Sequence, residues 1–144
     1  MNTDFLDAHD RHRQDADLLF EASRWANADH LYGVAAECGL KRLMMLFGMQ
    51  VEATTGAPKN LQDRAHINEA KKGSAWDRYE SYRSGYTAGA SYPLPTINPY
   101  ADWDVAQRYA HQSHFDEVRA KVHQNGANVV HVLIKKAKLD GLFS

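Results

Sequence analysis

The sequence predicts an all-α protein, a bundle of four to five helices that forms one domain over residues 1–144. Apolar residues recur at a spacing of three to four in several segments, which is the period of a helix with one buried face. Residues that favour helix starts and stops, such as Ser, Asp and Gly, bracket these segments. Prolines at positions 93, 95 and 99 indicate that the long segment 86–103 is irregular.

A first helix is predicted over residues 4–25, and a second from the break at Asn27–Asp29 to Gly48. Asn27 and Asp29 are both good N-cap residues, and Gly48 suits a left-handed C-cap. Apolar residues cover more than half the circumference of the second helix, which should therefore be central. They are Leu31, Val34, Ala35, Cys38, Leu40, Leu43, Met44 and Phe47.

Small residues recur every three positions in this second helix, at Gly33, Ala36 and Gly39. Each glycine inside a helix costs about 1 kcal/mol relative to alanine, so two of them indicate that a flat face is needed. We expect another helix to approach this face closely. Room for a ligand is the alternative explanation.

Two shorter helices are predicted after a loop over residues 49–60. One spans 61–72 and is interrupted at Gly73, and the other spans 75–84 and stops near Gly85. Ser74 with Asp77 three residues later resembles a capping box and predicts the start of the helix over 75–84.

The last helix is predicted to begin at Ser113, with Asp116 three residues later, and to run to about residue 138. Asn125–Gly126 interrupts its apolar face, so the helix could be kinked or broken there. The run VVHVLI is rich in β-branched residues and could form a strand by propensity alone. Helix is preferred because the flanking residues keep the helical period.

Composition argues against several classes of protein, although a local basic patch remains possible. Lys and Arg total 17 against 18 Asp and Glu, a net charge of −1, whereas a general nucleic-acid binder usually carries a clear positive excess. Cys38 is the single cysteine, which rules out an internal disulfide and a cysteine-based zinc site, and it is expected to be buried. No apolar run approaches about 18 residues, and the polar N-terminus is unlike a signal peptide. We therefore expect a soluble cytoplasmic protein with no membrane contact.

The stretch RYAHQSH places Arg108 six residues before His114. Such a pair could cleave RNA if the arginine stabilised the phosphate and the histidine transferred protons. This loose spacing is expected about 1.5 times by chance in this composition, and Arg24 with His30 is a second match. Because a helix start at Ser113 would leave Arg108 in the preceding loop, we favour a binding role for Arg108 over catalysis.

No metal site and no cofactor are predicted. His9 and His12 lie three residues apart, and His111 and His114 repeat this spacing. A metal site needs three or four ligands, so a solvated face is the favoured interpretation of both pairs. The sequence contains no P-loop, GxGxxG or GxSxG motif.

Aromatic residues are concentrated between positions 76 and 109, with arginines among them. We expect these rings to cover the bundle, with the tyrosine hydroxyls reaching polar partners. The alternative is a surface on which nucleic-acid bases stack.

Several of these features together resemble HEPN domains, which are small prokaryotic helical bundles. The run LYGVAAECGLKRLM carries Glu37 and Lys41 where that family often has an alanine-rich run with a Glu and a Lys four residues apart. His66 fits a histidine common early in the third helix of the family. Arg108–Tyr109 before the last helix is similar to the form found in members that accompany nucleotidyltransferases. The resemblance covers most of residues 4–138.

The resemblance implies a homodimer and a ligand site formed by Glu37, Lys41, His66, Arg108 and Tyr109. The favoured function is a non-catalytic binding module for a nucleotide, nucleic acid or partner protein, as in toxin–antitoxin or nucleotidyltransferase-associated systems. Many HEPN proteins are instead metal-independent ribonucleases, for which Arg108 and His114 would be the catalytic residues here. A purely structural dimerisation domain is the third possibility.

Overall fold

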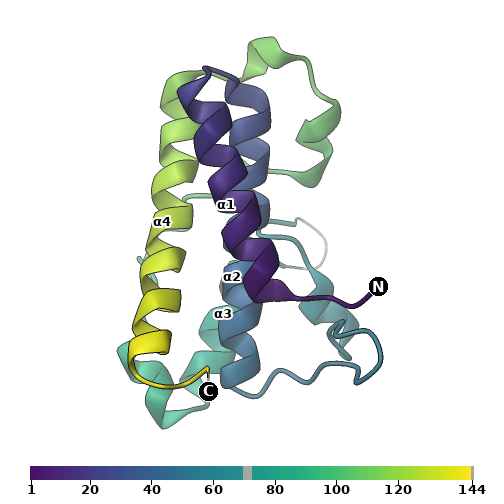
Figure 1. Cartoon of the computed structure of the whole chain (residues 1–144), viewed down its shortest axis with the longest axis vertical. Helices are drawn as coiled ribbons and strands as arrows, with labels where there is room; N and C mark the ends of the chain where they lie inside the picture. Colours follow the sequence, from purple (N-terminus) through teal and green to yellow (C-terminus); the bar gives the residue numbers. More distant parts are fainter. Residues whose placement is uncertain (70–72, 144) are drawn as a thin grey trace.

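The computed structural model describes residues 1–69 and 73–143, and within these ranges the chain is an all-helical bundle, as predicted. It has four α-helices: α1 (Phe5–Glu21), α2 (Trp25–Leu46), α3 (Ala75–Ser84) and α4 (Glu117–Leu139) (Figure 1). Four 3-10 turns lie between them: η1 (Leu61–Arg64), η2 (Thr87–Ser91), η3 (Val105–Tyr109) and η4 (Gln112–His114). None of the described residues forms a strand, and Val51 and Pro58 make an isolated bridge. No helix in these ranges is both long and apolar enough to cross a bilayer.

The long helices α1, α2 and α4 lie side by side, and α3 packs near the C-terminal end of α2 (Figure 1). α2 is central, as its wide apolar arc predicted: it contacts α1, α3 and α4. Its buried residues Leu40, Leu43 and Met44 join Val130 and Ile134 of α4 in the main core. Cys38 is also buried, as expected, and burial raises the pKa of its thiol to about 12.

The turn between α1 and α2 differs from the prediction. α1 ends at Glu21, and α2 begins at Trp25 rather than at an N-cap within Asn27–Asp29. Ser23 takes a left-handed conformation, with φ of 60°, in the tight turn between them. Asp29 lies inside α2 and is fully buried. Its carboxylate contacts His123, far along the chain, and does not cap a helix.

Gly48 ends α2 as predicted. It has φ of +103°, and the backbone N–H of Met49 donates to the Met44 carbonyl oxygen at 2.9 Å. This is the Schellman arrangement that requires a left-handed residue.

The two glycines of α2 allow close contact with different parts of the chain. A Cβ at Gly39 would lie 2.5 Å from Val130 Cγ1 of α4 and 2.7 Å from His9 Nδ1 of α1, so close helix packing explains this glycine. A Cβ at Gly33 would overlap the indole of Trp103, which belongs to the irregular segment and not to a helix. The expected helix contact therefore holds at Gly39, and an aromatic side chain takes its place at Gly33.

The prediction of a helix over 61–72 is wrong for residues 61–69, which the structure describes. Only the 3-10 turn η1 forms, Ala65 is extended with ψ of 146°, and residues 70–72 lie outside the described ranges. His66 is consequently not on a helix. α3 follows as predicted, with the Ser74 side chain accepting a hydrogen bond from the Asp77 N–H at 3.1 Å. Apart from η2, the segment 86–103 has no helix, as its prolines predicted.

α4 begins later than predicted and is unbroken. Its N-cap is Asp116, whose side chain accepts from the Arg119 N–H at 2.9 Å, whereas Ser113 belongs to η4. The preference for helix over strand across VVHVLI is confirmed. The helix is continuous at Gly126. The glycine makes room for Pro99 and Tyr100, since a Cβ would lie 2.9 Å from Pro99 Cγ and 2.8 Å from Tyr100 Cε2.

Candidate functional site

Three of the predicted site residues form one cluster. The Glu37 carboxylate accepts from Lys41 Nζ at 3.0 Å through one oxygen, and its other oxygen lies 3.0 Å from His66 Nδ1. The backbone N–H of Ile67 donates to the same carboxylate at 3.2 Å. Glu37 and Lys41 are four residues apart on α2, so the helix brings them together, and the carboxylate fixes the non-helical chain at His66 against α2.

The electrostatics of this cluster favour its charged form. Burial raises the pKa of Glu37, but the hydrogen bond from His66 and the charge of Lys41 outweigh burial, so the pKa is lowered overall. The hydrogen bond to Glu37 raises the pKa of His66. Lys41 is almost fully buried beside its carboxylate partner, so two of the three side chains have little free surface for a ligand.

Arg108 and Tyr109 lie apart from that cluster, on η3. Both are exposed, Tyr109 to 80%, and the Arg108 guanidinium lies 4.8 Å from the centre of the Tyr109 ring. Within the described part of the chain no carboxylate pairs with Arg108. No hydrogen bond or ion pair joins η3 to Glu37, Lys41 or His66 among those residues, although Arg108 and His66 both help to lower the pKa of His30, below burial in importance.

η3 is held in place by a buried polar network. The Asp29 carboxylate of α2 accepts from the Gln107 side chain of η3 and faces His123 Nδ1 of α4 at 2.7 Å. His123 Nε2 faces Asp102 at 2.8 Å, and Arg119 pairs with Asp102 at 3.1 Å. Asp29 and His123 are both fully buried.

The network holds His123 from both sides. Each of its ring nitrogens lies within hydrogen-bonding distance of a carboxylate oxygen, one from Asp29 and one from Asp102. Asp29 is fully buried, whereas the Asp102 side chain is 58% exposed. Breaking the buried Asp29–His123 contact would leave a polar group without its partner, so this contact favours one arrangement of α2 and α4.

The α1–α2 turn lies at one end of the bundle (Figure 1). A cleft is lined by this turn and by residues that follow η3. Its volume is about 370 Å³, within the range of small-molecule sites. Ala110, directly after Tyr109, lines it. The remaining lining residues are Ser23, Arg24, Trp25, Ala26, Asn27, Gln112 and Phe115.

The wall formed by the start of α2 is electropositive. No side chain caps α2, so the first N–H groups of a 22-residue helix lack a side-chain acceptor. The partial positive charge of a helix N-terminus adds to the Arg24 guanidinium there. Trp25 and Phe115 give the same cleft apolar surface.

Neither arginine–histidine pair shares one helix. Arg108 lies on η3 and His114 on η4, both before α4, and no contact joins them in the described ranges. Ser113 does not cap α4, so His114 lies in η4 and not in the first turn of α4. Arg24 lies at the α1–α2 turn. His30 belongs to α2, and its ring stacks on that of Trp103, with ring centres 5.5 Å apart.

The other histidines and the aromatic residues divide between core and surface. His111 and His114 are exposed, as expected, but His9 is fully buried, so a solvated face is wrong for the His9–His12 pair. Most of the aromatic residues between positions 76 and 109 pack against the helices of the bundle, as predicted. Tyrosine hydroxyls among them reach polar partners: the Tyr100 hydroxyl donates to the His123 carbonyl oxygen at 2.7 Å. Between positions 76 and 109, the buried rings are Trp76, Tyr79, Tyr92, Tyr100 and Trp103.

Sequence reasoning missed the Asp29–His123–Asp102 network. Asp29 resembled a helix cap, and its partner His123 lies 94 positions away. No spacing rule connects residues at that separation, so only the fold reveals the pair. Comparison with known proteins found no matching family model, no matching curated protein and no matching solved structure.

Proposed function

We propose that this protein is a non-catalytic binding module that holds a nucleotide in the cleft between the α1–α2 turn and residues 110–115. The observation that carries the proposal is the state of Arg108 and Tyr109. They are exposed and stacked, and no carboxylate within the described residues neutralises the guanidinium. They lie on a turn whose Gln107 side chain donates to the buried Asp29 carboxylate. A planar cation in a fixed position is well suited to clamp a phosphate.

The cleft offers complementary chemistry for the two halves of a nucleotide. Arg24 and the uncapped N–H groups at the start of α2 suit phosphate oxygens, while Trp25 and Phe115 suit a base. Arg108 and Tyr109 do not line the cleft but precede its lining residue Ala110 in the chain. The net charge of −1 makes a long nucleic acid a weaker candidate than a single nucleotide. The resemblance of Arg108–Tyr109 to nucleotidyltransferase-associated HEPN domains supports the same choice, and we propose HEPN-like ancestry on that basis.

Calorimetric titration with ATP, GTP and AMP tests this proposal. Arg108→Ala and Arg24→Ala should each weaken binding at least about tenfold, since a hydrogen bond to a charged group is worth about 1.5–3 kcal/mol. Arg11→Ala is the matched control, because Arg11 is an exposed arginine on α1 that pairs with Asp7 at 3.5 Å. His114→Ala should also bind normally.

A metal-independent ribonuclease is the competing function. The protein, incubated in chelator, should leave single-stranded RNA intact. Cleavage that Arg108→Ala and His114→Ala abolish equally would replace the binding proposal, since residues that act as one catalytic unit fail together.

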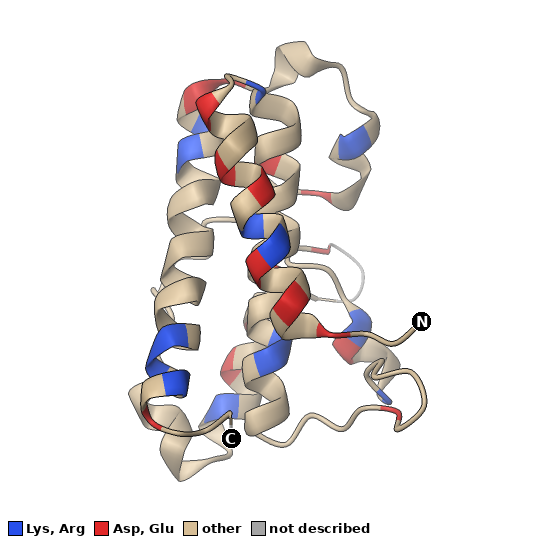
Figure 2. Cartoon of the chain, viewed as in Figure 1, with Lys and Arg blue, Asp and Glu red and all other residues tan. Residues whose placement is uncertain are grey.

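A second candidate function is dimerisation through α4, and one observation favours it. Val118, Val122, Asn125, Val129 and Val132 follow a four–three–four–three spacing, and all but the half-buried Val129 are exposed. This is the heptad seam of a helix that packs against another helix, with one polar residue that can fix register. We propose that a second copy of this chain covers this α4 seam, so that the binding module is a homodimer. Residues 122–134 carry no Lys, Arg, Asp or Glu, and Figure 2 shows the corresponding uncoloured stretch of α4.

A further inference from the structure

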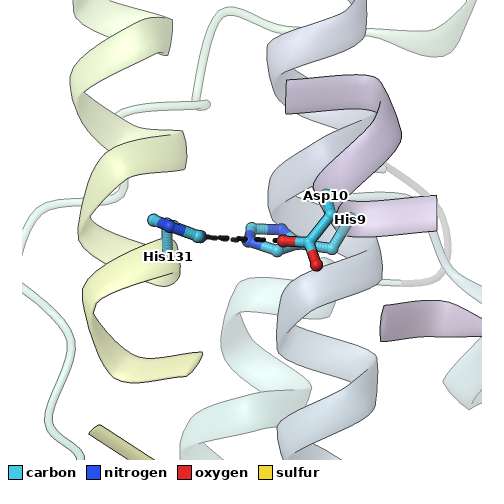
Figure 3. A group of neighbouring side chains, drawn as sticks. All are labelled: His9, Asp10 and His131. Atoms are coloured by element: carbon cyan, nitrogen blue, oxygen red, sulfur yellow. Dashed lines mark hydrogen bonds and ion pairs between the residues drawn. The ribbon is translucent and has the colours of Figure 1, made fainter. Parts of the chain in front are cut away.

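The side chains of His9, Asp10 and His131 meet between α1 and α4 (Figure 3). His9 Nε2 lies 3.1 Å from His131 Nδ1, and Asp10 Oδ1 lies 3.9 Å from the same His131 nitrogen. The three donor atoms lie within 4.8 Å of one another. We propose that this cluster is a binding site for one divalent transition-metal ion, with Zn²⁺ the best match.

The backbone orients His9 as a metal ligand. Its Nδ1 lies 2.8 Å from the carbonyl oxygen of Ala35, and because a carbonyl can only accept, Nδ1 carries the hydrogen. Nε2 therefore presents a lone pair toward His131. A histidine whose second nitrogen donates to a backbone carbonyl is the usual arrangement in metal sites, since it fixes the tautomer and the ring orientation.

Gly39 contributes to this orientation. A Cβ at this position would lie 2.7 Å from His9 Nδ1, so a larger residue would displace the imidazole ring from its place against α2. The glycine that permits close helix packing thus also holds a candidate ligand in position.

The spacing of the donor atoms fits a tetrahedral ion. Zinc–nitrogen bonds of about 2.0 Å place neighbouring ligand atoms about 3.3 Å apart. The His9–His131 separation of 3.1 Å is close to this value, whereas Asp10 Oδ1, 3.9 Å from His131 Nδ1, must move closer to complete the set. Without an ion, His131 must donate its Nδ1 hydrogen to His9 Nε2, so the competing explanation is a plain hydrogen bond.

The charges around the cluster are mixed. Asp10 supplies a negative charge at the site, and Arg13, Lys135 and Lys138 are positively charged neighbours of His9 or His131. Asp17 pairs with Arg13 at 3.7 Å, which offsets one of these positive charges.

Two imidazoles and one carboxylate favour Zn²⁺ or a similar transition metal over Mg²⁺ and Ca²⁺, which prefer oxygen ligands throughout. The side chains of His131 and Asp10 are 21% and 34% exposed, so an ion can enter from solvent. Three protein ligands leave a fourth position for water or another small ligand.

Calorimetric titration of chelator-treated protein with Zn²⁺ tests the site, and Co²⁺ absorption in the visible range reports a tetrahedral geometry. We expect one ion per chain with a micromolar or tighter Kd. His131→Asn and Asp10→Asn should each weaken binding at least about tenfold, which corresponds to about 1.4 kcal/mol. His114→Asn is the matched control, because it removes an exposed histidine outside the cluster.

Asp10→Asn keeps the volume of a half-buried side chain, so it separates loss of a ligand from loss of the fold, which circular dichroism checks. The proposal is overturned if wild type takes up no Zn²⁺ at about 100 µM. It is equally overturned if both variants bind Zn²⁺ as tightly as wild type. A thermal transition that Zn²⁺ leaves unchanged, together with a loss of stability in His131→Asn, would assign the contact to a hydrogen bond only.

Discussion

Glu37 uses both oxygens of one buried carboxylate to connect three donors from two parts of the chain. Lys41 comes from the same helix turn, whereas His66 and the Ile67 N–H come from a segment about 30 residues later. The sequence could indicate the first contact, since a Glu and a Lys four residues apart face one another on any helix. It could not indicate the second, because the segment containing His66 is not the helix that its residues predicted.

The pH dependence of stability should reveal the His66–Glu37 pair. The folded pKa of His66 lies above its ordinary value of 6.5, so its stabilisation is complete below pH about 6.5 and is lost as pH rises through the folded pKa. The folded pKa of Glu37 lies below 4.5, so its stabilisation is present above pH about 4.5 and is lost as pH falls. The pair should therefore contribute most between these two values.

Urea unfolding of wild type and His66→Ala at pH 6 and pH 8 measures this contribution. The free-energy difference between the two proteins should shrink at pH 8, while the difference between wild type and His114→Ala should be the same at both. An equal gap at both pH values for His66→Ala would show that the ion pair adds nothing.

At the scale of elements, local signals succeeded where no distant partner competed. Gly48 and Ser74 mark a helix end and a helix start through their own backbone and side-chain chemistry, and both assignments hold. Asp29 and Ser113 carry similar signals and fail as caps. Asp29 is engaged by His123 across the bundle, and Asp116, three residues beyond Ser113, caps α4 instead.

Two substitutions can show whether Asp116 or Ser113 caps α4. Asp116→Ala should destabilise the protein by about 1 kcal/mol, because it removes the acceptor for the Arg119 N–H at the start of α4. Ser113→Ala, at an exposed position in η4, should change the free energy of unfolding by less than about 0.5 kcal/mol. Equilibrium denaturation of both variants gives the comparison, and a larger loss from Ser113→Ala would restore the earlier helix start.

For the molecule as a whole, the helical class followed from periodicity because periodicity reports which face of each segment is buried. The segments that join the helices were not predictable in this way. Trp103 and Tyr100 are fully buried although their segment has no regular hydrogen-bond pattern, and their places depend on glycines in α2 and α4. The sequence shows the arginines of the proposed site, but only the folded structure shows the cleft.

Self-association should depend on the α4 seam. Sedimentation equilibrium at micromolar concentration should show a dimer for wild type and a monomer for Val122→Asp, because a charge cannot be buried in an apolar seam without a partner. Leu18→Asp is the matched control, since it places the same charge on an apolar residue of α1 that is 66% exposed and lies outside the seam. This variant should remain dimeric. Monomeric wild type at these concentrations would exclude the dimer.

Two fully buried rings, Tyr100 and Trp103, anchor their irregular segment to the bundle. To move away, it must withdraw one ring from the groove at Gly126 and the other from its place over Gly33. Local unfolding of a loop normally exposes its amides and its peptide bonds to solvent at little cost. Here the backbone N–H groups of Tyr100 and Trp103, which donate to Asn98 Oδ1 at 2.8 Å and to the Tyr100 carbonyl oxygen at 2.9 Å, should share the slow amide exchange of the helices, although they belong to none of them.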